Sequence, residues 1–248
     1  MKFLCLPGSF GSKVNYAVQL APFVTELESD GSASFTLTQG TYQCVPPNGF
    51  AEFFGPPPYF RFIDYDGLQR SDTVERLRNF PDGATAEETL RELMPAKDEE
   101  IVLDSVKVCF DTLYKTIEEE GPFDGILGYS EGATVASSLV LDEKRRFEEE
   151  GRPRSFKCAI FFAGWPPMRH NGRDLILADV DGEVIDIPTC HVIGAQDPYL
   201  QGSMALFNVC DAETAHLFDH GKGHTLPRDP RTLKELGDVV REMMIDCA

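Results

Sequence analysis

The stretch GILGYSEGATVASSLV, at residues 125–140, constrains the fold of this chain more than any other. An apolar run ends at Leu127, a Gly-x-Ser-x-Gly pattern follows, and small apolar residues with helical character resume after Ser130. This order is typical of a nucleophile elbow, a tight strand-to-helix turn in which glycines prevent collisions and a serine is raised above the sheet. The alternative is an ordinary turn in which the serine only caps the helix. The stretch predicts a buried strand, a turn at Ser130 and a helix.

Strand-like apolar runs and helical patterns alternate along the chain. Strands are predicted at 2–6, 34–40, 122–127, 157–164, 187–197 and 215–224, and helices at 16–29, within 87–119, from 131 and at 229–244. Such alternation predicts an α/β fold with a mostly parallel central sheet and helices on both faces. In these sheets the ligand lies beyond the carboxyl ends of the strands, so the motifs at strand ends matter most.

The length of 248 residues favours a single domain over 1–248, with an insertion or lid at about 41–95. Within that insertion, residues 50–65 read FAEFFGPPPYFRFIDY, and their three prolines exclude a regular helix. We expect a lid over the site that places Phe53, Phe54 and Tyr59 in the substrate pocket. The alternative is a small satellite core beneath a long connection, because aromatic side chains tend to become buried anywhere.

A serine nucleophile needs a base held by an acid, and in this fold class the chain order is serine, acid, histidine. Asp197 lies at the end of one predicted strand, in GAQDP, and His224 lies at the end of the next, in GKGHTLP. We therefore predict Ser130, Asp197 and His224 as the catalytic residues. The competing candidates are His220 for the base, and Asp219 and Asp186 for the acid.

The oxyanion of an acyl-transfer reaction needs main-chain N–H donors near the serine. The N–H of Glu131, directly after the serine, is one predicted donor. The other comes from the loop LPGSFGS after the first strand, at Ser9 or Phe10. The alternative is that this loop only turns the chain.

The formal net charge of −18 makes binding to nucleic acid or to an anionic membrane surface improbable. A basic cluster at residues 144–157 is either a docking patch for an acidic partner or a solvated helix end. The seven scattered cysteines and the short apolar N-terminal run predict reduced thiols and a cytoplasmic protein. We find no metal-ligand spacing and expect no cofactor.

The motifs LPGSFGS, GYSEGA, GAQDP and GKGHTLP occur in this order along nearly the whole chain. In this the chain resembles the fungal serine hydrolase (FSH) family of α/β-hydrolases, and the family's serine, aspartate and histidine correspond to Ser130, Asp197 and His224. Pro7 departs from the His-Gly pair that many members carry before the oxyanion loop. Within the family the chain looks like the discrete thioesterases and esterases of fungal polyketide biosynthesis.

The resemblance implies cleavage of an acyl thioester or ester, releasing a polyketide chain from a synthase carrier protein during transient contact with the synthase. Trp165, Tyr199 and Leu200 follow predicted strands and are expected to add apolar wall to the pocket. One alternative is a general carboxylesterase acting on small or lipid esters. Another is a non-catalytic binding protein on a hydrolase scaffold.

Overall fold

A six-stranded parallel sheet forms the centre of the protein. The computed structural model describes residues 1–46, 54–64, 79–81, 83–93, 99–169 and 174–247. The strands lie in the order β2-β1-β5-β6-β7-β8, and every neighbouring pair is parallel. They are β1 (Lys2–Leu6), β2 (Ser34–Leu37), β5 (Gly125–Tyr129), β6 (Cys158–Phe162), β7 (Thr189–Ile193) and β8 (Ala215–Asp219). The prediction of a mostly parallel central sheet is confirmed.

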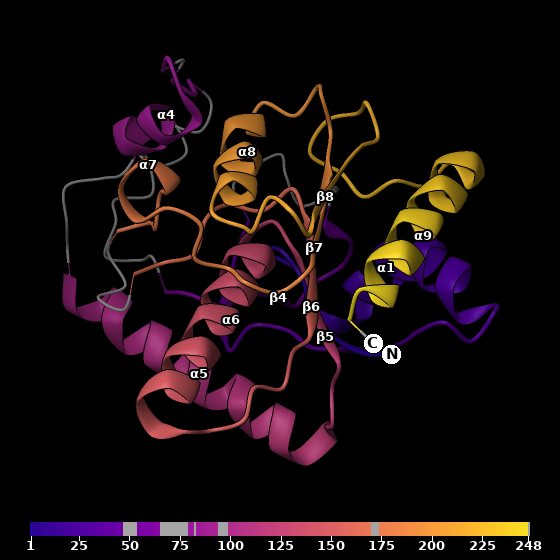
Figure 1. Ribbon diagram of the computed structural model, residues 1–248, viewed down its shortest axis with the longest axis horizontal. Coiled ribbons are helices and arrows are strands. Elements are labelled where there is room, and N and C mark those ends of the chain that lie inside the picture. The colour runs from indigo at the N-terminus through magenta and orange to yellow at the C-terminus, as the bar shows by residue number, and fades with distance from the viewer. Residues whose placement is uncertain (47–53, 65–78, 82, 94–98, 170–173, 248) are drawn as a thin grey trace.

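Helices cover both faces of this sheet (Figure 1). On one face lie α1 (Lys13–Glu28) and α9 (Pro230–Ile245), and on the other lie α5 (Glu99–Glu120), α6 (Glu131–Glu150) and α8 (Leu200–Asn208). Two shorter helices, α4 (Ala86–Leu93) and α7 (Ala178–Asp181), lie beyond α8. Among the described residues, no helix is both long and apolar enough to span a bilayer.

Alternate residues of the central strands belong to the two cores on either side of the sheet. In β1, Leu4 and Leu6 pack toward α6, whereas Phe3 and Cys5 pack toward α1 and α9. All four side chains are fully buried. This explains why the strands appear as continuous apolar runs, because a parallel strand is buried on both faces and does not alternate with polar residues.

The aromatic stretch at 50–65 is only partly a loop. Its residues Tyr59–Arg61 form β4, which pairs antiparallel with β3 (Tyr42–Cys44). The next two residues, Phe62 and Ile63, are buried in the same core as Leu4 and Leu6. Residues 55–58 are exposed, and Phe53 lies outside the described residues. The burial of Phe62 and Ile63 favours core packing at this end of the stretch.

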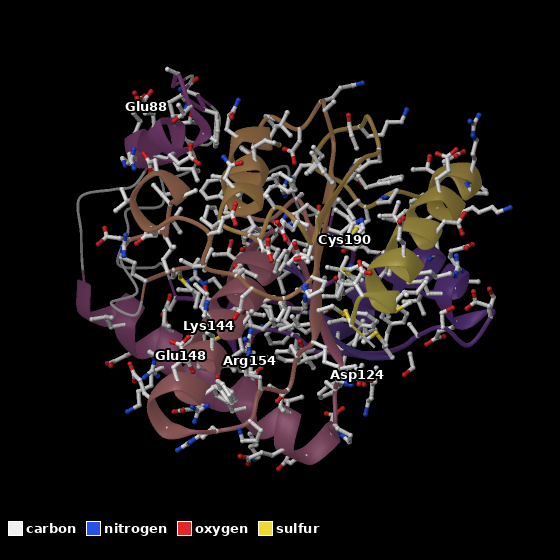
Figure 2. All side chains as sticks on the ribbon, in the orientation of Figure 1. Glu88, Asp124, Lys144, Glu148, Arg154 and Cys190 are labelled. Carbon is white, nitrogen blue, oxygen red and sulfur yellow. The ribbon has the colours of Figure 1, made fainter. Side chains whose placement is uncertain are left out.

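The basic cluster at 144–157 lies in the last turns of α6 and in the chain that follows (Figure 2). Lys144 and Arg154 both pair with Asp186, and the Arg146 guanidinium stacks on the ring of Tyr114. The remaining pairs are Arg145 with Asp142 and Glu149, Arg152 with Glu150, and Lys157 with Asp124. These acidic neighbours cancel much of the positive field, which favours a solvated helix end over a docking patch.

Candidate active site

Ser130 lies in the sharp turn between β5 and α6 with φ 53° and ψ −120°. This conformation costs a non-glycine residue about 1–3 kcal/mol, and the surrounding structure must hold it in place. The Ser130 N–H donates to the Phe162 carbonyl of β6 at 2.9 Å. A Cβ on Gly128 would lie 2.4 Å from Ala133 Cα, and one on Gly132 would lie 2.3 Å from the Leu6 carbonyl oxygen. The turn therefore fits only with glycine at both positions.

Asp197 and His224, from two later strand ends, complete a hydrogen-bonded chain that ends at Ser130. His224 Nε2 lies 3.0 Å from Ser130 Oγ, and His224 Nδ1 lies 2.7 Å from Asp197 Oδ2. The Asp197 side chain is 2% exposed and that of His224 is 24% exposed. Because the carboxylate accepts a hydrogen bond from Nδ1–H, the proton stays on Nδ1 and the Nε2 lone pair faces the serine hydroxyl.

Two tyrosines hold the acid and the histidine in place. The Tyr199 N–H donates to Asp197 Oδ1 at 2.8 Å, which occupies the carboxylate oxygen that His224 does not use. The Tyr129 hydroxyl donates to the His224 carbonyl at 3.1 Å. The His224 ring contacts both phenol rings, with its centroid 5.5 Å from that of Tyr129 and 5.3 Å from that of Tyr199. The imidazole is thus oriented by its neighbours as well as by Asp197.

None of the competing candidates belongs to this hydrogen-bonded chain. The main-chain N–H of His220 donates to the Ile193 carbonyl, its ring Nδ1 is buried without a hydrogen-bond partner among the described residues, and burial lowers the pKa of this side chain. Asp219 Oδ1 accepts the N–H groups of Ala195 and Gly221, so this carboxylate holds a turn together. Asp186 forms a two-bond ion pair with Arg154. The structure brings Ser130, Asp197 and His224 together in one hydrogen-bonded chain, and none of these alternatives takes part in it.

The loop after β1 passes directly beside Ser130. A Cβ on Gly8 would lie 3.1 Å from Ser130 Cβ, and Phe10 has a φ of 67°. Within the described part of the chain, the N–H groups of Ser9, Phe10 and Glu131 have no hydrogen-bond acceptor. Free N–H groups beside Ser130, one of them at a helix N-terminus, are suited to an anionic oxygen.

Aromatic side chains lie on two sides of the site. Phe54 packs on Phe10 with ring centroids 5.0 Å apart. Beside His224, Tyr199 contacts Phe80 at 5.4 Å, and Phe80 contacts Trp165 at 5.9 Å. A cavity of about 310 Å³ borders the same apolar cluster and is lined by Leu90, Arg91, Asp174, Leu175 and Leu177.

Leu200 and Tyr59 complete the predicted pocket residues that the structure describes. Leu200 is half-buried at the start of α8, three residues after Asp197. The Tyr59 hydroxyl donates to the Gly55 carbonyl, so its polar end is used within its own loop. Among the described residues, no three histidine, cysteine or acidic side chains are grouped to hold a metal ion.

Sequence reasoning missed three side chains of this site: Tyr129, Phe80 and the carboxylate of Glu131. Tyr129 and Glu131 flank the serine in the motif, but nothing in their spacing indicates that their side chains contact His224 or the loop after β1. Phe80 stands in a polar stretch, NFPDGAT, without a strand or helix pattern. No sequence signal identifies these contacts, because their partners lie far away along the chain.

The parallel sheet, the elbow and the order of the three strand-end residues define an α/β-hydrolase. Similar folds are found in the esterase PE8 (TM-score 0.54, 18% identity, covering 98% of this chain and 92% of that one). A similar fold is also found in acyl-protein thioesterase 2 of Zea mays (TM-score 0.55, 13% identity, covering 98% of this chain and 93% of that one). The predicted fold class is confirmed.

The chain belongs to the FSH1 serine hydrolase family, whose model matches residues 1–236. It is 33% identical to the esterase FPY3 of Fusarium mangiferae over 147 residues, which are 56% of this chain and 65% of that one. It is 26% identical to the hydrolase phiM of Talaromyces stipitatus over 95% of this chain and 84% of that one. The protein is therefore a serine hydrolase, as the motifs predicted.

Proposed function

We propose that the protein hydrolyses an acyl ester or thioester with Ser130 as nucleophile, His224 as general base and acid, and Asp197 as its orienting acid. The observation that carries this proposal is the pair of hydrogen bonds, 3.0 Å and 2.7 Å long, that link Ser130 to His224 and His224 to Asp197. Both distances are within the range for a serine activated by a base that is itself held by an acid.

In the proposed reaction, Ser130 Oγ attacks the acyl carbonyl while His224 Nε2 takes the hydroxyl proton. The carbonyl oxygen becomes an oxyanion stabilised by the N–H of Glu131 and by that of Ser9 or Phe10. The bond to the leaving group breaks and His224 gives its proton to that group. Water, deprotonated by His224, then hydrolyses the acyl-serine, and Asp197 stabilises the imidazolium in both steps.

We propose a polyketide acyl chain on a carrier protein as the substrate. Two features support an extended apolar acyl group: the ring cluster of Tyr199, Phe80 and Trp165, and the contact of Tyr199 with His224. The motifs also resemble those of fungal polyketide esterases. A general carboxylesterase is the second candidate, and the esterase name of the Fusarium mangiferae relative favours it.

Substitution of the proposed nucleophile tests the chemistry. Ser130→Ala should abolish labelling by a fluorophosphonate probe and lower kcat on p-nitrophenyl esters about 10⁴-fold or more. His224→Ala should lower kcat to a similar extent. His220→Ala is the matched control, since it removes a histidine from the same loop and should leave kcat within a few-fold of wild type.

Two outcomes would contradict this assignment. Labelling that survives Ser130→Ala would place the nucleophile elsewhere, and a loss of turnover in His220→Ala but not in His224→Ala would reassign the base. A wild-type protein that neither reacts with the probe nor cleaves any ester would indicate a binding protein on a hydrolase scaffold.

The substrate class needs a separate measurement. Wild-type protein is incubated with polyketide chains on an acyl carrier protein and with p-nitrophenyl esters of matched length, and released acids are identified by mass spectrometry. A kcat/KM at least tenfold higher on carrier thioesters supports polyketide release. A preference for the simple esters would support the carboxylesterase.

A further inference from the structure

Glu131, the residue after the proposed nucleophile, uses its carboxylate to join three separate segments. Its Oε1 accepts the Ile63 N–H and its Oε2 accepts the Phe62 N–H, both at 3.2 Å. The Ser9 hydroxyl lies near the same carboxylate and acts to lower its pKa. One side chain at the start of α6 therefore connects the loop after β1 with the chain that follows β4.

An ionised carboxylate is the group that suits this position. It accepts hydrogen bonds on both oxygens, whereas an amide side chain can accept on only one. Burial raises the pKa of Glu131, and the hydrogen bond from Ile63, the Ser9 hydroxyl, the hydrogen bond from Phe62 and the charge of Arg61 act in the opposite direction. These groups thus favour the ionised form of the carboxylate.

Glu131 is connected to both proposed oxyanion donors. Its own N–H is one proposed donor, and its carboxylate holds Ser9, whose N–H or that of Phe10 is the other. Phe10 has a left-handed φ of 67°, so the loop needs external contacts to keep this shape. A donor misplaced by about 1 Å can cost roughly 10²-fold in rate.

Glu143, in the same helix, shows the same contact in a purely structural setting. Its Oε2 accepts the Ser155 and Phe156 N–H groups at 3.0 Å and 3.2 Å. Glu143 is twelve residues after Glu131, or roughly 18 Å farther along α6. Comparing substitutions of Glu131 and Glu143 therefore distinguishes what such a carboxylate contributes to stability from what it contributes to the site.

We propose that Glu131 is a positioning residue whose carboxylate holds the Ser9–Phe10 loop and the Phe62–Ile63 segment at a fixed distance from the elbow, so that both oxyanion donors converge on one point. This rests on the proposed acyl-transfer function. The carboxylate does not touch the reacting atoms, and it acts through the main-chain donors on either side of Ser130.

The test compares Glu131→Gln and Glu131→Ala with Glu143→Gln and Glu143→Ala. On a short p-nitrophenyl ester, both Glu131 variants should lower kcat about 10- to 100-fold with KM changed less than threefold. Affinity for a trifluoromethyl ketone, which forms a tetrahedral oxyanion on the serine, should fall by the same factor as kcat/KM. The Glu143 variants should lose unfolding stability to a similar extent but keep kcat and ketone affinity.

Ser9→Ala provides a second route that removes one hydroxyl and keeps the main chain. It should lower kcat roughly three- to tenfold, and its effect should nearly vanish in the Glu131→Ala background because both changes break the same contact. Circular dichroism confirms that each variant is folded at the assay temperature.

Retention of kcat and ketone affinity within threefold in the folded Glu131 variants would overturn the proposal. An equal loss in the Glu143 variants would also overturn it, since the effect would then follow general stability. Failure of the underlying function looks different, because the wild-type protein itself would then neither cleave the ester nor react with a fluorophosphonate.

Discussion

At the scale of single residues, the site depends on how closely backbone segments approach one another at the elbow. A Cβ on Gly132 would meet two carbonyl oxygens of the chain leaving β1, those of Leu6 at 2.3 Å and Pro7 at 2.4 Å. The absence of a side chain there lets the first turn of α6 lie against the segment that carries Ser9. Helix, nucleophile and loop are therefore in mutual contact through backbone atoms.

Gly132→Ala should disrupt this contact. The added methyl group forces α6 and the loop after β1 apart, so we expect the free energy of unfolding to fall by about 1–3 kcal/mol and kcat on esters to fall at least tenfold. Urea unfolding and steady-state kinetics measure the two effects.

Gly151→Ala is the control for this substitution. Gly151 caps the other end of α6 with φ 68°, and a Cβ added there would meet no described atom within 4 Å. Its replacement should cost about 1 kcal/mol from backbone strain and leave kcat unchanged. Wild-type kcat in Gly132→Ala would show that the close approach is not needed for turnover.

At the scale of elements, segments outside the sheet shape the surroundings of the triad. The loop after β7 carries Tyr199 to His224, and the chain before α4 brings Phe80 against it. The α4 helix is attached to α8 by a hydrogen bond from Asn208 to Glu87, and to α7 by an ion pair between Arg91 and Asp179. The aromatic side of the site is thus built by connections rather than by strands.

Phe80→Ala should reduce activity in a way that depends on chain length. If the ring contacts the acyl chain, kcat/KM should fall about tenfold for a long acyl ester and less than twofold for an acetyl ester, because a short acyl group does not reach it. A series of p-nitrophenyl esters measures this difference.

Phe35→Ala is the matched control for Phe80. Phe35 is also half-buried among aromatic rings, since it stacks on Phe3 and meets Phe23 edge-on, but it lies in the edge strand β2. It should lower stability without altering the ratio between long and short esters. Equal losses on both esters in Phe80→Ala would mean that this ring does not contact the substrate.

At the scale of the whole molecule, pH acts on stability through groups buried in the core. His191 in β7 is 1% exposed, and its ring lies between those of Phe161 and Phe207. Its Nε2 lies 3.0 Å from the Thr189 hydroxyl. Burial lowers the pKa of His191 to about 3 from its ordinary value of 6.5.

This shift predicts a loss of stability in acid. Below pH 6.5 the unfolded chain takes up a proton at His191, whereas the folded protein does so only near pH 3, so the free energy of unfolding decreases as the pH falls through that window. At pH 5, proton uptake by His191 in the unfolded chain lowers the free energy of unfolding by about 2 kcal/mol. His191→Phe should lack it, so that its stability falls less between pH 7 and pH 5 than that of the wild type.

Urea unfolding at both pH values measures the effect, with Phe207→Leu as the control. That substitution weakens packing against the same ring but keeps the histidine, so it should lower stability equally at both pH values. If the free energy of unfolding depends on pH identically in wild type and His191→Phe, His191 does not cause the loss of stability in acid.

The sequence alone was sufficient to locate the parallel strands and the segments that carry Ser130, Asp197 and His224. These features are local: a buried parallel strand is a continuous apolar run, β1 occupies the predicted residues 2–6, and the elbow requires glycines at fixed offsets from its serine. The β3–β4 hairpin was not predicted, because the aromatic stretch at 50–65 shows no strand periodicity.

The tertiary structure decided which distant side chains meet. Ser9 and Ile63 reach Glu131 from two segments far apart along the chain, and Phe80 reaches Tyr199 across more than a hundred residues of chain. Such contacts depend on how helices and connections pack against the sheet, and packing is a property of volumes and shapes in three dimensions. Sequence spacing therefore determines the order of the segments that carry Ser130, Asp197 and His224, while packing determines which side chains surround and support them.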